Sequence, residues 1–561
     1  MEPRPWHDQY DPGVRGTIEI REVTLPELLR ESARRHGGLA ALRFLNCEMN
    51  YEQLDGEVDR LAGTLRALGV NAGDRVAIQL PNLPQTVISF FAVLRAGAVA
   101  VMTNPLYTPR EIEQQWNDAG CRVAITMDFL FASTLTELAD RVPVEQWIVA
   151  SIPEYLRFPL NLLAPLKLRR EKLLADVPDR PDVHRFLDAV ERGAPEPLPG
   201  GPSFADLAAL QYTGGTTGRA KGAMLTHGNL SSQVQQLRNW MPHLSTGEET
   251  FLSALPFFHV FGLTVGMTLP ISLASTLVLV PNPREIKRLV DSINKFRVTV
   301  FPVVPAMVNG INAHPAAKSL RVDSLKLCVS GSAPLPEDTL RRFEELTGGR
   351  LVEGYGLTEA SPVTHVNPAT GKRRVNWIGL PLPETDCRLA SVTDPEQPAA
   401  PGEAGELLIR GPQVMAGYWN RPDASQETLR DGWLHTGDLA EMDADGWFRI
   451  VGRKKEIIIC GGYKVYPDEI DRVLMEHPDI VECATIGVPD EKRGETPKSF
   501  VVLRPGAKLT AEQVEQHCRA ELAAYKIPRQ IEFRSELPKS SVLKILRRVL
   551  VEEELAKRES A

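Results

Sequence analysis

The chain has 561 residues, more than one hydrophobic core usually supports, so two or more domains are expected. With 43% hydrophobic and 24% charged residues, its composition is that of an ordered globular protein and excludes a low-complexity chain. A formal net charge of -8, from 64 basic and 72 acidic residues, argues against a general nucleic-acid binder, which carries a dominant basic face.

The cysteines and the N-terminus both bear on the compartment. The seven cysteines are scattered and form neither a CxxC pair nor the spacing of zinc ligands, which favours a reduced compartment. The first residues contain neither the basic nor the apolar region of a signal peptide. We therefore expect a cytoplasmic protein.

The first 450 residues alternate helical and strand patterns, which predicts an α/β fold whose layered domain has largely parallel sheets. Leucine and valine recur at helical spacing from residue 51 to 68, and Gly69 follows, so a helix is expected there. Residues 75–80 predict a strand, and residues 84–97 predict a helix that begins at Pro84.

The segment at 154–174 mixes leucines with five basic residues: Arg157, Lys167, Arg169, Arg170 and Lys172. This composition is typical of a peripheral membrane contact and predicts weak binding to an anionic lipid surface, on the inner face of the membrane. Pro159 and Pro165 are expected to interrupt any single helix. The alternative is a surface insertion that packs on the large domain.

Residues 250–283 contain no Asp, Glu, Lys or Arg and are long enough to span a bilayer. Prolines and glycines divide the segment, so buried strands and a core helix are expected instead of a membrane span. Buried strands are also expected at 298–304 and 325–331, followed by a helix at 336–348 that ends in glycine. Both strands lead into loops with glycine or proline, where α/β folds place ligands.

The pattern changes after about residue 452, where we place the boundary at the polar run 452–456. Short strands and helices then suggest a compact α+β unit of roughly a hundred residues. We expect a large domain over residues 1–452 and a small C-terminal domain over residues 453–561. The strands expected in the small unit are 447–452, 456–460, 481–488 and 498–503, and its helices are 467–477 and 511–522.

A stretch at 211–227, QYTGGTTGRAKGAMLTH, has the residue types of a phosphate loop. Its glycines let backbone N–H groups face phosphate oxygens, and its threonines and Lys221 add donors and charge. It fails the P-loop pattern, because Gly218 is followed by Arg219, Ala220 and Lys221 without the Gly-Lys-Ser/Thr ending. A Walker-type NTPase is therefore not expected.

Five further motifs follow the loop in order: SGSAPLP at 330–336, GYGLTE at 354–359, the run 431–455, GGYKVYPDEI at 461–470 and LPKSSVLKILRR at 537–548. Together they resemble the adenylate-forming superfamily of acyl-CoA synthetases, firefly luciferase and peptide-synthetase adenylation domains. The resemblance covers about residues 25–550. The motif YTGGTTG, residues 104–111 and the run ending at Lys455 are most similar to bacterial long-chain fatty-acid–CoA ligases.

The resemblance implies a large adenylation domain and a small mobile C-terminal domain that carries the catalytic lysine. It implies that the loop wraps the β- and γ-phosphates of ATP, that Glu359 holds Mg²⁺, and that Thr358 lies near the α-phosphate. The implied loop residues are Thr213, Gly214, Gly215, Thr216, Thr217, Gly218 and Lys221.

The nucleoside is assigned in the same way. Asp438, helped by Arg453, matches the carboxylate that accepts hydrogen bonds from the ribose diol. The turn Gly331–Ser332–Ala333 and the ring of Tyr355 are expected to form a flat slot for adenine.

Lys544 matches the family's adenylation lysine, whose ammonium bridges the incoming carboxylate and the α-phosphate. This chain departs from the pattern at Leu543, where relatives nearly always have glycine. Glycine permits a backbone angle that leucine adopts only at a cost of roughly 1 kcal/mol. Slow adenylation is therefore an expectation. Gly214, Ala220 and Trp377 also differ from the commoner residues.

For the second half-reaction, the resemblance implies that the small domain rotates about Lys455 and brings Gly461 and Gly462 to line a tunnel for CoA. Phe257, Phe261 and Gly356 are expected to form the acyl pocket, with His259 near the carboxylate. Acetyl-activating relatives have tryptophan at the position of Gly356, so a deeper pocket is expected here.

These residues predict a long-chain fatty-acid–CoA ligase that uses ATP and Mg²⁺ to make acyl-AMP from a medium- or long-chain acid, and transfers the acyl group to CoA. Three alternatives stay open: an aryl-acid CoA ligase, a fatty-acyl-AMP ligase that loads a separate carrier protein, and a catalytically weak fatty-acid-binding homologue. Chain-length preference and oligomeric state are not predicted.

Overall fold

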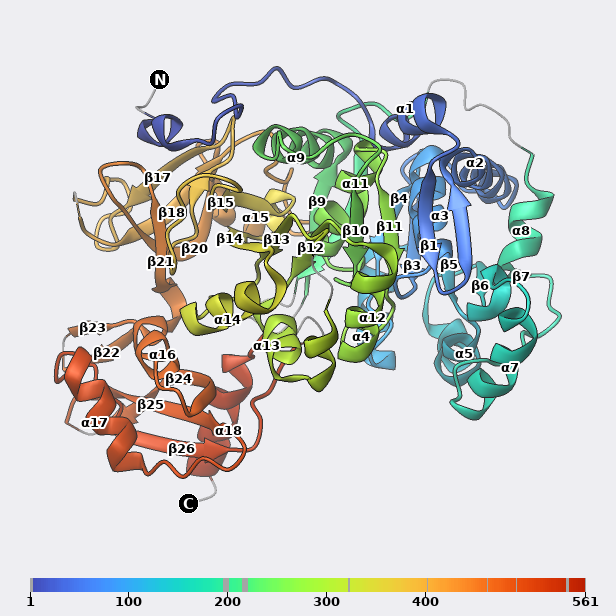
Figure 1. The fold of residues 1–561 in the computed structure, drawn as a ribbon. Helices are drawn as coiled ribbons and strands as arrows, with labels where there is room; N and C mark the ends of the chain where they lie inside the picture. The colour runs from blue at the N-terminus through green and yellow to red at the C-terminus, as the bar shows by residue number, and fades with distance from the viewer. Residues whose placement is uncertain are drawn as a thin grey trace.

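The computed structural model describes residues 4–194, 201–213, 220–320, 323–400, 402–461, 463–490, 492–540 and 544–559. Within these residues the strands form four sheets, and helices pack around them in layers (Figure 1). The fold is the expected one, with a large N-terminal α/β part and a small C-terminal unit.

One sheet has the strand order β7-β6-β5-β3-β4-β8-β9 and is parallel except at β8 and β9, which form an antiparallel hairpin. Its strands are β3 Arg75–Gln79, β4 Val99–Met102, β5 Cys121–Met127, β6 Gln146–Ala150, β7 Val183–Arg185, β8 Leu207–Thr213 and β9 Lys221–Thr226. The connecting helices are α3 Pro84–Arg95, α4 Pro109–Ala119, α5 Asp128–Leu130, α6 Thr136–Leu138, α7 Leu160–Arg170 and α8 Phe186–Arg192. The strand at β3 and the helix from Pro84 were both predicted.

A second sheet has the order β16-β15-β14-β13-β12-β10-β11-β1-β2, parallel from β1 to β14 and antiparallel at both ends. Its strands are β1 Ala40–Phe44, β2 Cys47–Asn50, β10 Thr250–Ser253, β11 Thr276–Leu279, β12 Val300–Val303, β13 Leu327–Ser330, β14 Arg350–Gly356, β15 Val363–Val366 and β16 Leu380–Pro381. The helices of this region are α1 Leu25–His36, α2 Tyr51–Ala67, α9 His227–Trp240, α10 Val260–Leu263, α11 Leu269–Ser272, α12 Ile286–Phe296, α13 Pro305–Ala313 and α14 Glu337–Thr347.

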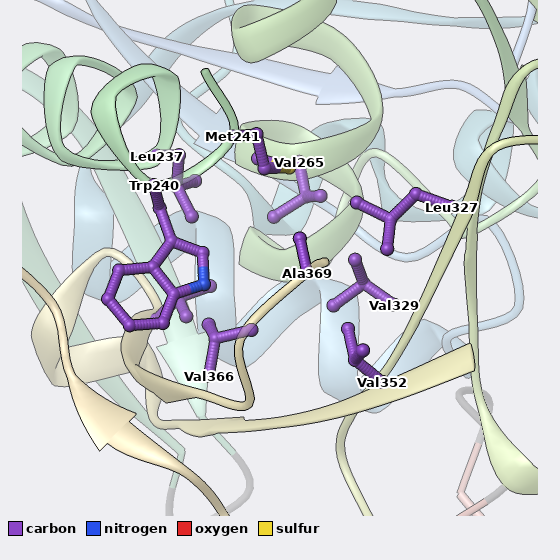
Figure 2. Close-up of a pocket in the computed structure, with 10 residues that line it drawn as sticks. Leu237, Trp240, Met241, Val265, Leu327, Val329, Val352, Val366 and Ala369 are labelled. Atoms are coloured by element: carbon purple, nitrogen blue, oxygen red, sulfur yellow. The ribbon is translucent and has the colours of Figure 1, made fainter. Parts of the chain in front are cut away.

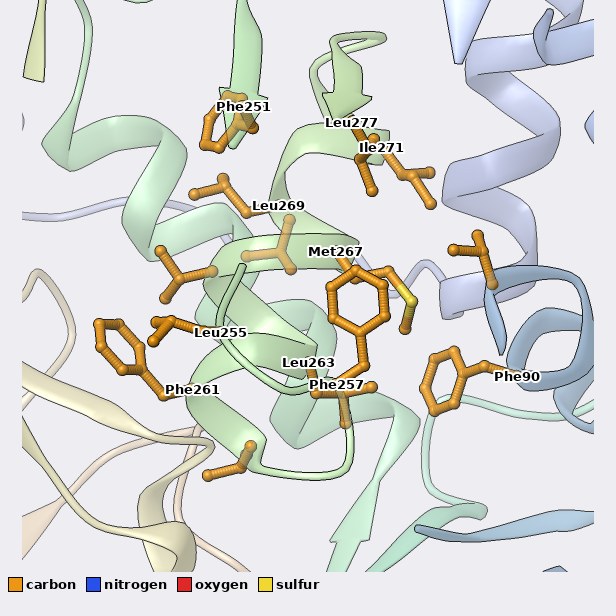
Figure 3. Packing of buried hydrophobic residues seen from close by; sticks show 14 of the residues in the cluster. Phe90, Phe251, Leu255, Phe257, Phe261, Leu263, Met267, Leu269, Ile271 and Leu277 are labelled. Atoms are coloured by element: carbon orange, nitrogen blue, oxygen red, sulfur yellow. The ribbon is translucent and has the colours of Figure 1, made fainter. Parts of the chain in front are cut away.

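The uncharged segment at 250–283 is part of this core, as predicted. It supplies β10, a run of short helices and β11, and the side chains along it pack against one another (Figure 3). Among the described residues, no helix is both long and apolar enough to cross a bilayer.

The third sheet consists of β17 Asp386–Ala390, β18 Gly405–Arg410, β20 Trp433–Met442, β19 Leu429–Arg430 and β21 Phe448–Arg453, with α15 Pro422–Thr428 beside it. The prediction that the strand at 447–452 belongs to the small unit is wrong, because β21 pairs with β20. A turn with Gly446 in the left-handed conformation, φ +81°, returns the chain onto β20 as a hairpin. The expected domain boundary at 452 stays a prediction.

The C-terminal unit has its own sheet and its own buried core, and Figure 1 shows it apart from the other sheets, below β21 and α14. The expected strands and helices after residue 456 are present. The elements are β22 Ile458–Cys460, β23 Tyr463–Val465, β24 Ile480–Asp490, β25 Gly494–Leu503, β26 Gln530–Arg534, α16 Pro467–Met475, α17 Ala511–Glu521 and α18 Arg547–Glu559.

The expectation that Pro165 interrupts any helix in the segment at 154–174 is also wrong. Helix α7 continues through Pro165. Proline removes one hydrogen bond, to the carbonyl of Asn161, and Asn161 is exposed, so water can replace the lost donor. The alternative of a packed insertion fits in part: Leu156 is buried in the core of the large domain and Leu160 and Ala164 pack against it, while no residue of α7 is fully buried.

Candidate functional site

A cleft with a cavity volume of about 590 Å³ lies where β13, β14, β20 and the start of the C-terminal unit meet. It brings together residues from motifs more than 300 positions apart in the sequence. The predicted site residues that line it are Thr213, Lys221, His259, Phe261, Gly331, Ser332, Tyr355, Gly356, Thr358, Glu359, Asp438, Arg453, Lys455 and Lys544.

Asp438 is the centre of a hydrogen-bonded group at one wall of the cleft. Its carboxylate accepts a hydrogen bond from the Tyr355 hydroxyl at 2.6 Å and pairs with Nε of Arg453 at 2.8 Å. Asp438 and Arg453 face each other because β20 and β21 pair in that register. Each carboxylate oxygen still has a free lone pair, so the fixed carboxylate can accept hydrogen bonds from a diol.

The phosphate loop closes the β8–β9 hairpin. Residues 214–219, which include Gly214, Gly215, Thr216, Thr217 and Gly218, lie outside the described residues, but the two flanking residues are placed. Thr213 and Lys221 are paired across the hairpin, and both line the cleft. The two strand ends that flank the loop therefore lie at the cleft.

Tyr418 connects this hairpin to Glu359, and the sequence analysis did not single it out. Its hydroxyl donates to Oε1 of Glu359 at 2.7 Å, and the ammonium of Lys221 lies 5.0 Å from its ring centroid. Burial is the main cause that raises the pKa of Tyr418, with the Glu359 carboxylate second, so the phenol remains a donor. Glu359 is thus held in place while its second oxygen is left for another ligand.

Mg²⁺ prefers oxygen ligands and is usually held by one or two carboxylates together with substrate phosphates. The carboxylate of Glu359, which lines the cleft together with Thr213 and Thr358, fits this kind of site. No cluster of three or more His, Cys, Asp or Glu side chains able to hold a metal exists among the described residues. A cation here would therefore need oxygens from a bound substrate.

His259 is neutral and oriented. Burial, and to a smaller extent the nearby Lys544 ammonium, lower its pKa to about 4. Nδ1 accepts the backbone N–H of Phe261 at 3.2 Å, at the start of α10. The proton of the neutral ring is therefore assigned to Nε2, which can donate to a carboxylate or carbonyl.

Lys544 reaches the cleft from the C-terminal unit. A short antiparallel bridge between Lys539 and Ile545, with the Ser540 N–H donating to the Lys544 carbonyl, fixes the backbone around it. Desolvation lowers the pKa of Lys544, Arg453 adds to the effect, and Asp438 opposes it. Within the part of the chain that the structure describes, the Lys544 ammonium forms no ion pair. Leu543 lies outside the described residues.

The apolar end of the cleft is closed by tight backbone packing at Gly356. A Cβ atom there would lie 1.8 Å from the Pro362 carbonyl oxygen, so glycine is required by the close approach of β14 and β15. A Cβ at Gly331 would lie 3.2 Å from the ring of Phe261. Gly356 therefore lines the cleft. Two causes account for glycine at this position: the close approach of β14 and β15, and the depth of the pocket.

A second, smaller cavity of about 10 Å³ lies behind this wall and is surrounded by apolar side chains from α9, β13, β14 and β15 (Figure 2). It shares Val329 and Val363 with the cleft. Trp240 closes the far side, and its buried indole N–H has no hydrogen-bond partner among the residues that the structure describes. The two valines therefore separate the cleft from further apolar space.

Three predicted site residues lie elsewhere. Phe257 is fully buried beside the uncharged helices of the core (Figure 3) and does not line the cleft. Ala333 is not among the lining residues either. Gly461 is exposed in the turn between β22 and β23, and its neighbour Gly462 lies outside the described residues.

Comparisons with known proteins agree with this geometry. The model of the AMP-binding enzyme family matches residues 29–419, and that of the AMP-binding enzyme C-terminal domain matches residues 469–544. The chain is 44% identical over 555 residues to a long-chain-fatty-acid–CoA ligase of Bacillus subtilis, covering 98% of each chain. It is 36% identical over 517 residues to a feruloyl-CoA synthase of Amycolatopsis, covering 92% of this chain and 94% of that one.

Solved structures of similar fold include ATP-bound MatB from Rhodopseudomonas palustris, with a TM-score of 0.82, 28% identity, and coverage of 95% of this chain and 99% of that one. Another is an anthranilate CoA ligase in complex with anthranoyl-AMP, with a TM-score of 0.83, 27% identity, and coverage of 96% and 98%. With family matches on both sides of the cleft and relatives aligned over nearly the whole chain, this protein belongs to the AMP-binding enzyme family.

Proposed function

We propose that the protein is an AMP-forming fatty-acid–CoA ligase that acts on a medium- or long-chain acid. The observation that carries the proposal is the cleft, which places Lys544, His259, Glu359 and Asp438 around one space with an apolar end. The 44% identity to a long-chain-fatty-acid–CoA ligase over 98% of each chain supports the same substrate class.

The first step is the attack of a carboxylate oxygen on the α-phosphorus of ATP, which forms acyl-AMP and releases pyrophosphate. Two anions must meet, so cationic groups and fixed donors are needed. The ammonium of Lys544 bridges the carboxylate and the α-phosphate, while Nε2–H of His259 orients the carboxylate. Thr213, Lys221 and the loop between them hold the β- and γ-phosphates, with Thr358 near the α-phosphate.

The remaining residues of the cleft bind the nucleoside and the cation. Asp438, fixed by Tyr355 and Arg453, accepts hydrogen bonds from the ribose diol, and the Gly331–Ser332–Ala333 turn faces adenine. Glu359 holds Mg²⁺, which supplies positive charge to the phosphate oxygens.

In the second step the sulfur of CoA attacks the acyl carbonyl carbon, AMP leaves with the electrons of the broken C–O bond, and the thiol proton passes to solvent. We place the boundary between the domains at 452/453 and the hinge at Lys455. The position of Lys455 in the short turn Lys454–Glu456, between β21 and the C-terminal sheet, supports this assignment. Gly461 and Gly462 are then expected to line the CoA tunnel after rotation.

Pyrophosphate exchange tests the proposal. Purified protein is incubated with ATP, Mg²⁺ and labelled pyrophosphate, with fatty acids of rising chain length or with aryl acids, and with or without CoA. Exchange that increases toward long-chain acids, with acyl-CoA formed when CoA is added, is expected. No exchange with any acid would reject the enzyme in favour of a binding protein, and exchange without acyl-CoA would favour a carrier-loading ligase. Preference for aryl acids would point to the anthranilate- or ferulate-type ligases.

We also propose that the protein is cytoplasmic and touches the inner face of the membrane through α7. All seven cysteines are unpaired, which supports a reduced compartment. Leu162, Leu163 and Leu166 are 66%, 59% and 75% exposed, and their spacing places them on one side of α7, while Phe158, just before the helix, is 77% exposed. Residues 157–172 carry five basic and one acidic side chain, while the whole chain is negative, so this patch is where an anionic surface would attract the protein.

A further inference from the structure

One arginine close to Lys544 in the sequence binds three carboxylates at once. Arg547, the first residue of α18, donates through Nη1 to Glu456 at 2.6 Å and through Nη2 to Asp471 at 2.5 Å, and it also pairs with Asp468. The four side chains are between 14% and 27% exposed. Their interactions are therefore partly shielded from solvent.

The three carboxylates come from the segments next to the cleft. Glu456 ends the short turn that contains Lys455, and it lines the cleft together with Lys544. Asp468 and Asp471 lie on α16. Glu456 and Asp468 are also close enough to Lys544 to act on its charge, as are Asp438 and Arg453 from the other wall.

The Lys544 ammonium lies among these carboxylates without forming an ion pair to any described residue, while Arg547 holds Glu456 and Asp468. Glu456 and Asp468 already act on the charge of Lys544, and Arg453 is paired with Asp438, so a carboxylate released from Arg547 would have the Lys544 ammonium within reach. Such a pair would occupy the ammonium that adenylation requires.

We propose that Arg547 is a positioning residue for adenylation, which holds Glu456 and Asp468 away from Lys544 so that the ammonium stays available to the substrate. The inference rests on the proposed function, since it concerns the availability of Lys544 in that reaction. It also gives a physical reason for arginine at this position. A guanidinium has five donors in a rigid plane and can serve three carboxylates, whereas an ammonium cannot span them.

The test compares the two half-reactions in the full-length protein. Adenylation is measured by pyrophosphate exchange with palmitate, and transfer is measured from preformed palmitoyl-AMP to CoA, a step in which the proposed mechanism gives Lys544 no role. Arg547→Gln is expected to lower exchange by about tenfold or more, because each freed carboxylate competes for Lys544. Transfer and the melting temperature are expected to change much less.

Neutralising the released carboxylates provides the matched control. Glu456→Gln and Asp468→Asn, added to Arg547→Gln, are expected to restore exchange to within about threefold of the wild type. Glu512→Gln, at an exposed carboxylate on α17 of the same unit, is the matched control and is expected to leave exchange unchanged. A loss of exchange that the added substitutions fail to restore, or an equal loss in both half-reactions, would overturn the inference and show a purely structural role.

If Arg547→Gln fails to fold, Arg547→Lys replaces it. This variant keeps the positive charge but loses the planar set of guanidinium donors. A severalfold loss of exchange with unchanged transfer is therefore expected. An equal loss in both half-reactions would again overturn the inference. The proposed function fails separately. Wild-type protein without exchange would reject the function, whereas wild-type exchange that survives Arg547→Gln would reject only the role of Arg547.

Discussion

At the scale of single residues, we expect Lys544 to act in adenylation and not in fatty-acid binding. Its ammonium is a charge at the cleft and contributes nothing to the apolar wall. Lys544→Ala is therefore expected to lower pyrophosphate exchange by roughly 100- to 1,000-fold, the usual effect of losing one transition-state charge contact. Fatty-acid binding, measured by isothermal titration, is expected to survive. Lys508→Ala, an exposed lysine of the same unit, is the control, and near-normal exchange in Lys544→Ala would remove this residue from the mechanism.

Val329 and Val363 separate the cleft from the small cavity closed by Trp240 (Figure 2). We expect a long acyl chain to point toward this boundary, so a larger side chain there is predicted to affect long acids selectively. Val329→Phe is predicted to lower kcat/KM for palmitate by about tenfold or more and to leave octanoate and the KM for ATP nearly unchanged. An equal loss for both acids would place the acyl chain elsewhere.

At the scale of elements, α7 exposes apolar residues and carries Lys167, Arg169 and Arg170 in its last turns. Insertion of leucines into the lipid interface adds apolar burial, and each basic residue near an anionic surface adds about 1 kcal/mol. Co-sedimentation with phosphatidylglycerol vesicles at low salt is therefore expected. Replacing Leu162 and Leu166 by Asp is predicted to lower the bound fraction at least tenfold, since it removes apolar area and adds like charge.

Phosphatidylcholine vesicles and a Leu555→Asp variant are the controls, because Leu555 is exposed on α18, away from α7 (Figure 1). Wild-type protein that stays in the supernatant with anionic vesicles would contradict the assignment of α7.

Elements with strong local signals could be predicted from the sequence. The spacing of apolar residues and a closing glycine located α2 and α14, and continuous apolar runs located β3, β12 and β13. The two errors share a cause. The pairing of β21 with β20 depends on tertiary structure, and the continuation of α7 through Pro165 depends on solvent access. A local sequence pattern contains neither kind of information.

The site was predictable only in part. Single motif residues such as Asp438, Glu359 and Lys544 meet in one cleft, as expected. Tyr418 and Arg547 were not found, because each matters through partners far away in the sequence: Glu359 for Tyr418, and Glu456, Asp468 and Asp471 for Arg547. Phe257 has the residue type of a pocket wall, and only the packing shows that it belongs to the core.

At the scale of the whole molecule, buried histidines make stability depend on pH. His365 is fully buried, and burial lowers its pKa to about 3. As the pH falls below about 6.5, the unfolded chain binds a proton at this residue before the folded chain does, so the free energy of unfolding decreases. The carboxyls of Glu353 and Glu154, with pKa values raised by burial to about 8 and about 7, act in the opposite direction.

A variant isolates the histidine contribution from these carboxyls. Between pH 7 and pH 5 the His365 contribution amounts to roughly 2 kcal/mol, at 1.36 kcal/mol for each pH unit below 6.5. His365→Gln is predicted to lose less thermal stability over this range than the wild type and His36→Gln do, as measured by the melting temperature. Parallel pH dependence in all three proteins would contradict a buried neutral His365.

The nucleotide product tests the central claim most directly. Purified protein is given ATP, Mg²⁺, palmitate and CoA, and the products are separated by chromatography. Palmitoyl-CoA, AMP and pyrophosphate in equal amounts are predicted, because the cleft is arranged for attack at the α-phosphorus. ADP with phosphate, or no thioester with any fatty acid, would contradict the account.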